Sequence, residues 1–228
     1  MKHLELREQE IFKTLKELIN LNFVIIEGYG VNSYTLPRFS VDCDLVVKNQ
    51  QDSEKIAKTL NKLGYKEEAK SNADTPYSGE FIRFEKKIEK DFKVSFDILI
   101  GKVLDRQTGA STSAEWIFDN STIRVLKGKT FKEKLEAKIP SAEALVVMKF
   151  ISCRNTDIRD IFMMITHVND FKFVKNEVSE RTDFEKQYET LKEKVFSKDF
   201  KDNLQGVFGF VQEETFEKHK KLILKLEK

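Results

Sequence analysis

The spacing of the apolar residues changes near residue 140, and this change limits what the chain can fold into. Up to about Leu126 the apolar residues form short runs or alternate with polar residues, as in strands set between helices. From Pro140 onward they follow the period of amphipathic helices. The pattern predicts an α/β (α+β) domain at residues 1–135, followed by a small helical domain at residues 136–228.

Helices and strands alternate at the start of the chain. The segment Ile11–Ile19 places its apolar residues on one helical face, which predicts an amphipathic helix. The apolar, β-branched run Phe23–Ile26 predicts a buried strand that leads into a glycine-bearing turn at residues 27–30. A second strand is expected at residues 41–47.

Two further strand patterns lie in the middle of the chain. Glu80–Lys86 and Phe92–Ile100 flank a charged stretch and predict an antiparallel hairpin, and Thr122–Leu126 predicts one more strand. Loops are expected at two stretches of small polar residues, 72–78 and 108–113.

Short polar side chains mark the expected helix starts. Asp52 or Ser53 can cap the helix after the second strand, and Ser141 and Thr156 can cap two helices of the second part. Two more helices are expected there, with apolar faces at residues 184–195 and 216–226.

Charge and cysteine content exclude several classes of protein. The 40 basic residues nearly balance the 38 acidic ones, so a net charge of +2 gives no overall field that attracts polyanions, although a local basic cleft fits the same composition. Cys43 and Cys153 lie far apart without CxxC spacing, which argues against a disulfide framework or a zinc site. With no signal-peptide pattern and no apolar run of membrane-spanning length, we expect a cytoplasmic protein without a membrane partner.

The acidic residues at the start of the second strand are the first candidates for chemistry. Asp42 and Asp44 flank Cys43, and because side chains alternate along a strand, the two carboxylates share a face with their Cα atoms about 7 Å apart. Hard carboxylate oxygens suit a divalent cation. Taken alone, the pattern also fits a solvated strand end.

A third carboxylate lies in an apolar strand. Asp97 stands among Phe96, Ile98 and Leu99, where an unpaired buried charge is costly unless the side chain points to a wet face of the sheet. If this strand lies beside the strand of Asp42, three carboxylates converge, as a two-metal site for phosphoryl transfer requires.

These residues carry a resemblance to a known family. The segment Glu27–Leu45 resembles, without a gap, the pattern G-G-Y-A-V-N-x-H-G-x-P-R-x-T-x-D-x-D of small nucleotidyltransferases of the DNA polymerase beta type superfamily, in the branch related to AbiEii abortive-infection toxins. Downstream, Ile139–Ile161 resembles the helical segment of the family, with a Lys followed by an Arg-Asp pair. The matched stretches span roughly residues 23 to 165, with identities confined to the motifs.

The resemblance implies a nucleotidyltransferase-type mixed sheet flanked by helices, a nucleotide site and a set of Mg²⁺ ligands. The implied catalytic residues and metal ligands are Asp42, Asp44 and Asp97. The implied nucleotide-binding residues are Gly28, Tyr29, Gly30, Arg38, Ser40 and Lys149. Gly28 would let a triphosphate approach the backbone, and Lys149 would neutralise its charge.

Several of these residues also have a purely structural interpretation. Arg38 can bond loop carbonyls, Lys149 can be a solvated helix residue, and Tyr29 can pack in the core. Arg159 and Asp160 favour helix capping or ion pairs between the two parts of the chain over contact with substrate.

The chain departs from the family pattern at one position that bears on its function. Glu27 replaces the first motif glycine, and a carboxylate beside the phosphate turn repels a triphosphate unless it points away. Smaller departures are Gly30 in place of Ala and Tyr34-Thr35 in place of His-Gly.

Two functional hypotheses follow from this sequence. The first is an Mg²⁺-dependent nucleotidyltransferase that transfers a nucleoside monophosphate from an NTP to an acceptor hydroxyl and releases pyrophosphate. The acceptor can be an RNA 3′ end such as that of tRNA, a protein or a small molecule, and a basic stripe beside the carboxylates would favour RNA. The second is a non-catalytic binding module of the same fold, a toxin–antitoxin component with an antitoxin as its partner.

Overall fold

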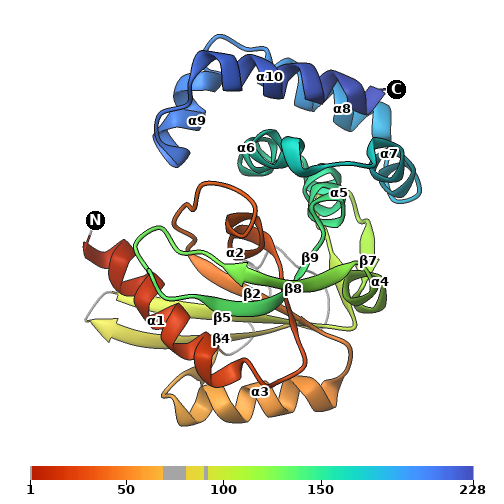
Figure 1. Cartoon of the computed structure of the whole chain (residues 1–228). Coiled ribbons are helices and arrows are strands. Elements are labelled where there is room, and N and C mark those ends of the chain that lie inside the picture. The colour runs from red at the N-terminus through yellow and green to blue at the C-terminus, as the bar shows by residue number, and fades with distance from the viewer. Residues whose placement is uncertain (1, 69–80, 90–91, 228) are drawn as a thin grey trace.

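The fold was determined as a computed structural model, which describes residues 2–68, 81–89 and 92–227. Its described strands include a five-stranded mixed sheet in the order β1-β2-β5-β4-β3 (Figure 1). The bounds are β1 Val24–Ile25, β2 Asp42–Val47, β3 Lys66–Glu67, β4 Phe81–Glu89 and β5 Phe92–Ile100. β2 and β5 are parallel, and the other neighbouring pairs are antiparallel. The mixed sheet and the predicted hairpin, β4–β5, are confirmed.

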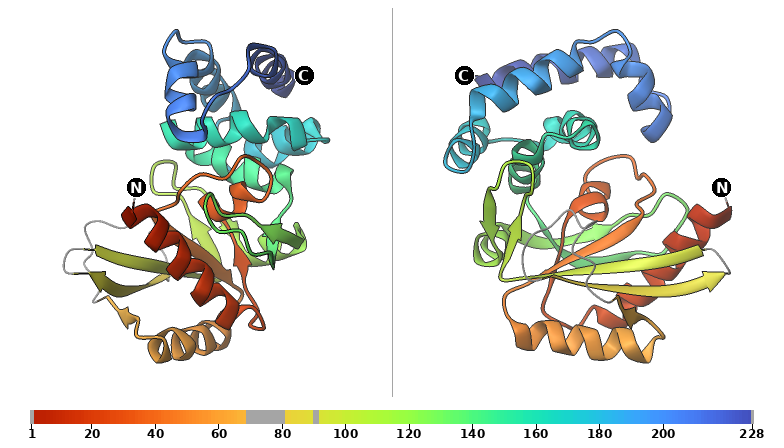
Figure 2. Two further views of the ribbon diagram at one scale, coloured as in Figure 1. Left: turned by 60° about the vertical axis from the view of Figure 1, so that its left-hand side comes forward. Right: turned by 180° about the vertical axis from the view of Figure 1, so that it is seen from behind.

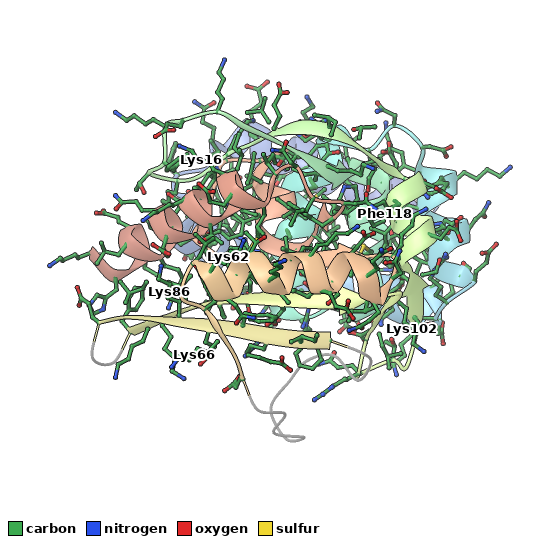
Figure 3. The ribbon with its side chains drawn as sticks, turned by 90° about the horizontal axis from the view of Figure 1, so that it is seen from below. Lys16, Lys62, Lys66, Lys86, Lys102 and Phe118 are labelled. Atoms are coloured by element: carbon green, nitrogen blue, oxygen red, sulfur yellow. The ribbon has the colours of Figure 1, made fainter. Side chains whose placement is uncertain are left out.

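Two helices cover one face of this sheet. α1 (Lys2–Leu18) and α3 (Gln50–Lys62) lie side by side on the lower face, as the view from below shows, with Lys16 on α1 and Lys62 on α3 labelled (Figure 3). The buried apolar residues of α1 recur at helical spacing, so the amphipathic pattern predicted this packing. The N-cap of α3 is Asn49, whose side chain accepts from the Asp52 backbone N–H at 2.9 Å, rather than Asp52 or Ser53.

Residues 27–30 form a helix rather than the expected turn. α2 (Glu27–Asn32) follows β1 directly on the other side of the sheet, and a loop then leads to β2 (Figure 1). Glu27 begins the helix with φ 52°, in the left-handed region that glycine adopts most easily.

Two small hairpins and a short helix connect the sheet to the helical part. Their bounds are β6 Lys102–Leu104, β7 Ser111–Ser113, α4 Ala114–Asp119, β8 Ser121–Leu126 and β9 Leu135–Pro140. β7 lies inside the stretch 108–113 that was expected to be a loop, and β9 and α4 were not predicted. The other expected loop, 72–78, lies outside the described residues.

The last third of the chain is helical, as predicted, and gathers on one side of the sheet (Figure 2). Its helices are α5 Ala142–Ser152, α6 Asn155–Met164, α7 Phe171–Ser179, α8 Phe184–Val195, α9 Phe200–Phe208 and α10 Glu213–Ile223. Ser141 caps α5 as predicted, whereas α6 begins after Arg154, ahead of the expected cap at Thr156. No described helix is long and apolar enough to cross a membrane.

One buried apolar cluster extends through both parts of the chain. It includes core residues of β2 and β5, of β9 and of α5 to α10. A direct contact shows how closely the parts meet, because a Cβ placed on Gly30 of α2 would lie 3.3 Å from the Leu145 side chain of α5. The predicted division after residue 135 falls at the first residue of β9, which pairs with β8.

Candidate active site

Asp44, Asp97 and Arg83 form a row across three adjacent strands. The parallel pairing of β2 with β5 sets Asp44 opposite Asp97, and the antiparallel pairing of β5 with β4 sets Arg83 opposite Asp97. Side chains of paired residues lie on the same face of a sheet. Asp42 precedes Asp44 by two residues, so it shares this face. The three carboxylates singled out from the sequence therefore come together.

Arg83 holds the third carboxylate with a two-pronged hydrogen bond. Its Nε donates to Asp97 Oδ1 at 2.8 Å, and its Nη2 donates to Asp97 Oδ2 at 2.7 Å. Nη2 also lies 3.9 Å from Asp42 Oδ2. Because Asp97 is fully buried, this geometry supplies the partner that a buried carboxylate needs.

The carboxylates of β2 are in an environment that disfavours their charge. Burial raises the pKa of Asp44 well above its usual range, and the neighbouring Asp42, Glu27 and Asp97 raise it further. Burial also raises the pKa of Asp42, and repulsion from Asp97 adds to this effect while Arg83 opposes it. A cation placed among these groups would relieve both penalties.

Lys149 lies in a buried ionic cluster between the two parts of the chain. Its ammonium group, on α5, bonds Glu27 of α2 and Asp157 of α6, the latter at 2.9 Å, and lies 3.4 Å from Asp160. Burial lowers the pKa of Lys149, but Glu27, Asp157 and Asp160 raise it more, so the net shift is upward. Lys149 is only 3% exposed, and thus its ammonium neutralises protein carboxylates here.

Arg38 completes this cluster from the loop before β2. Its Nε and Nη2 donate to the two carboxylate oxygens of Asp160 at 2.9 and 2.7 Å, and its Nη1 donates to the Phe39 carbonyl at 3.4 Å. The ion pair expected for Asp160 is confirmed. The net charge of Glu27, Arg38, Lys149, Asp157 and Asp160 is −1, and Arg154, whose Nε lies 2.6 Å from Asp157, balances it.

The remaining residues of the expected nucleotide site pack against the protein itself. A Cβ on Gly28 would lie 2.3 Å from Ser40 Oγ, so Gly28 allows the loop before β2 to cross α2 closely. Tyr29 is 1% exposed and meets the ring of Phe12 edge-on at 5.9 Å. In this structure the Tyr29 ring is therefore a core side chain and not part of an exposed nucleotide surface.

The capacity of this site for a metal ion depends on Arg83. Within the described ranges, no group of three or more His, Cys, Asp or Glu side chains is arranged to hold a cation. Asp42 and Asp44 offer the hard oxygen ligands that Mg²⁺ prefers, whereas both oxygens of Asp97 accept hydrogen bonds from Arg83. Two of the three expected ligands fit, and the third fits only after Arg83 has moved.

Comparison with known proteins assigns the fold. No family model and no curated protein sequence matches the chain. Among solved structures, it is similar to a candidate nucleotidyltransferase from H. pylori, with 15% identity and a TM-score of 0.50 over 97% of this chain and 96% of that one. It is also similar to JHP933 from Helicobacter pylori, with 16% identity and a TM-score of 0.50 over 100% of this chain and 94% of that one. The chain has a nucleotidyltransferase-like fold.

Within this nucleotidyltransferase-like fold, two functional contacts were not predicted from the sequence. The first is Arg83 on Asp97, although a partial signal for it exists, because the two residues lie on the two strands of the predicted hairpin, β4 and β5. The second is the pairing of Glu27 with Lys149, whose partners are 122 residues apart. In both contacts, an unpredicted partner neutralises the charge of a residue that the sequence had singled out.

Proposed function

We propose that the protein is an Mg²⁺-dependent nucleotidyltransferase that transfers a nucleoside monophosphate from an NTP to an acceptor hydroxyl and releases pyrophosphate. The observation that carries this proposal is the alignment of Asp44 with Asp97 on parallel neighbouring strands, with Asp42 on the same face. Three converging carboxylates are what two-metal phosphoryl transfer needs. The nucleotidyltransferase-like fold supports the proposal.

The residues of this chain divide the work as follows. Asp42 and Asp44 would hold Mg²⁺, which supplies electrostatic stabilisation to the phosphoryl group in transfer. Asp97, once Arg83 has released its oxygens, is placed to accept the proton of the acceptor hydroxyl. The strands β2 and β5 fix these side chains in one register, so positioning contributes much of the rate.

The test is isothermal titration of the protein with each of the four NTPs, with and without Mg²⁺. We expect Mg²⁺-dependent binding of at least one NTP, and loss of that binding in Asp42→Asn. Asp119→Asn is the matched control, because Asp119 is an exposed carboxylate at the end of α4 and is not one of the three clustered carboxylates. NTP binding that is equal in Asp42→Asn and the wild type would refute the metal role of this residue.

Transfer itself is tested with labelled NTP. Candidate acceptors are an RNA 3′ end, including that of tRNA, a protein hydroxyl and a small molecule, and we place the reaction in the cytoplasm, where NTPs are available. Label that reaches an acceptor in the wild type and not in Asp44→Asn supports the mechanism. Equal labelling by both proteins contradicts it.

A second candidate function is favoured by the two ion pairs at the site. Arg83 forms an ion pair with Asp97, an expected metal ligand, and Glu27 forms one with Lys149, an expected phosphate-binding residue. Within the protein itself, both charges are therefore already neutralised. Such a site suits a non-catalytic binding module, related to AbiEii toxins and acting with an antitoxin partner. This version predicts that neither ATP nor GTP binds in an Mg²⁺-dependent way.

A further inference from the structure

A pocket of about 500 Å³ opens beside the carboxylates on the outer part of the sheet. Arg83, Glu85 and Lys87 alternate along β4 and point to one face, together with Lys93 and Ser95 of β5. The right view of Figure 2 shows this hairpin reaching the edge of the molecule on the side of the N-terminus. The complete lining is Arg7, Val41, Asp42, Arg83, Glu85, Lys87, Phe92, Lys93 and Ser95.

The charges that line this pocket are not balanced. Lys93 pairs with Glu85. Arg7 and Lys87 take part in none of the ion pairs between described residues. Arg7 lies over the ring of Phe92 at 5.0 Å, and its Nε is buried without a hydrogen-bond partner in the described part of the chain. An anion in the pocket would give the Arg7 and Lys87 side chains the charge partner that they lack among the residues described.

Arg83 belongs to the pocket and to the carboxylate cluster at once. It lines the pocket, and it bonds both oxygens of Asp97 at 2.8 and 2.7 Å. A guanidinium binds a phosphate in the same two-pronged way as it binds a carboxylate, so exchanging one for the other conserves its hydrogen bonds. An anion that enters the pocket therefore competes with Asp97 for Arg83.

We propose that this pocket binds a phosphate group of the acceptor, and that Arg83 is a displaceable counter-ion which releases Asp97 when that phosphate binds. The proposal rests on the nucleotidyltransferase function proposed above and names the chemistry of its acceptor. In the free protein Arg83 keeps the third carboxylate neutralised. With the phosphate bound, Asp97 becomes available to a cation or to the acceptor hydroxyl, so the site is completed only when the acceptor is present.

This exchange requires that anion binding and cation binding strengthen each other by the same factor. The experiment measures the affinity of the full chain for Mn²⁺ by isothermal titration, without an anion and with a saturating single-stranded RNA hexamer that ends in a 3′-hydroxyl. We expect the hexamer to strengthen Mn²⁺ binding about tenfold, in the usual range of coupling between sites. Titration of the hexamer should show the same factor when Mn²⁺ is present.

Variants locate the coupling at Arg83. In Arg83→Gln, Mn²⁺ should bind about tenfold more tightly without any anion, and the hexamer should add little. Asp97→Asn removes the carboxylate that Arg83 releases. Any strengthening of Mn²⁺ binding by the hexamer that remains in this variant measures direct contact between the anion and the metal. Lys62→Gln is the control of matched charge change, since Lys62 is exposed on α3, which covers the opposite face of the sheet, and it should behave as the wild type.

Two more variants keep the test decisive. If Arg83→Gln does not fold, Arg83→Lys replaces it, because an ammonium cannot hold both oxygens of Asp97 in a fork, and Mn²⁺ binding without anion should again strengthen. The double variant Arg7→Gln, Lys87→Gln should weaken binding of the hexamer, and it should not change the affinity for Mn²⁺ when the hexamer is absent. Full coupling retained in a folded Arg83 variant, or no binding of an anionic probe to the wild type, overturns the proposal.

A second probe, glycerol phosphate, separates the two sources of a phosphate. If glycerol phosphate gives the coupling, the acceptor is a small phosphate ester. If only the hexamer gives it, with a slope of log affinity against log salt of about −0.7 for each phosphate contacted, the acceptor is a nucleic acid. If an NTP binds but the coupling is absent, only the proposed phosphate site in the pocket is refuted. If the coupling is present but no NTP binds, the proposed nucleotidyl transfer is refuted and the phosphate site is retained.

Discussion

Glu27 is the residue at which this chain differs most from the nucleotidyltransferase pattern, and the structure gives the physical reason. It has φ 52°, which glycine adopts at lower cost than glutamate by about 1–2 kcal/mol. Its carboxylate bonds the buried ammonium of Lys149. A carboxylate beside a buried ammonium lowers the cost of burying that charge. The ion pair between Glu27 and Lys149 therefore offsets the backbone strain at Glu27.

Glu27→Gly restores the motif glycine and tests this account. Without the carboxylate, the repulsion of a triphosphate falls and Lys149 keeps Asp157 and Asp160 as partners. We expect ATP binding in the presence of Mg²⁺ to strengthen about tenfold, equivalent to about 1.4 kcal/mol. Glu27→Gln is the matched variant, because it removes the charge and keeps the side chain, and it should lie between wild type and Glu27→Gly in titration. No gain in either variant would show that Glu27 does not limit nucleotide binding.

The contact between Gly28 and Ser40 sets how closely the loop before β2 crosses α2. A Cβ on Gly28 would lie 2.3 Å from Ser40 Oγ and 2.9 Å from Ser40 Cβ. Gly28→Ala should therefore destabilise the protein by about 1–3 kcal/mol in urea denaturation, the usual cost of overpacking. The double variant Gly28→Ala, Ser40→Gly should recover most of that loss. A single variant as stable as the wild type would show that the loop can move aside.

At the scale of elements, the hairpin β4–β5 and its parallel neighbour β2 build the site. The sequence predicted the strands and the hairpin, because alternating and apolar patterns are local signals. It did not predict the register, since the hairpin has an irregularity between Lys87 and Glu89 that shifts the pairing. Register alone decides that Arg83, and not Glu85, stands opposite Asp97.

The strand β2 also gives the protein a pH dependence that is unusual for carboxylates. The pKa of Asp44 is raised above its ordinary 3.8 in the folded state, mainly by burial, so the folded protein binds more protons than the unfolded chain above that pH. Stability contributed by this group therefore falls as the pH rises from 3.8 toward its folded pKa. Asp157, whose pKa is lowered because Lys149 and Arg154 outweigh burial, acts in the opposite sense below that window.

Asp44→Asn isolates this effect. We expect the variant to gain stability over the wild type as the pH rises between about 4 and 7, because it has no charge to bury. The measurement is the free energy of unfolding in urea across this range, with EDTA present. Asp119→Asn is the exposed control and should follow the wild type. A constant difference between Asp44→Asn and the wild type would mean that Asp44 does not titrate in this range.

At the scale of the whole molecule, the two parts of the chain share one core and one ionic cluster. Arg38 reaches Asp160 of α6 from the loop before β2, and Lys149 of α5 reaches Glu27 of α2. Trp116 of α4 stacks on Phe173 of α7 with the ring centroids 6.3 Å apart. These contacts join elements that precede and follow residue 135.

The shared core predicts that the protein unfolds in one step. Trp116 is the only tryptophan in the sequence, so its fluorescence reports the contact between α4 and α7, while far-UV ellipticity reports all helices. We expect the two signals to give the same urea midpoint in the wild type. In Phe173→Ala both midpoints should fall together. A fluorescence transition that precedes the loss of ellipticity would instead indicate two independently folding domains.

The sequence by itself determined the main strands, the helical character of the last third of the chain and the three carboxylates, because hydrophobic period and short motifs are encoded within a few residues. The tertiary structure decided the electrostatics of the site. Lys149 was expected to face a triphosphate and instead bonds Glu27, and Asp97 was expected as a free ligand and instead bonds Arg83. Both outcomes depend on which charges meet after burial, where an unpaired charge is too costly to remain, and no local pattern records that.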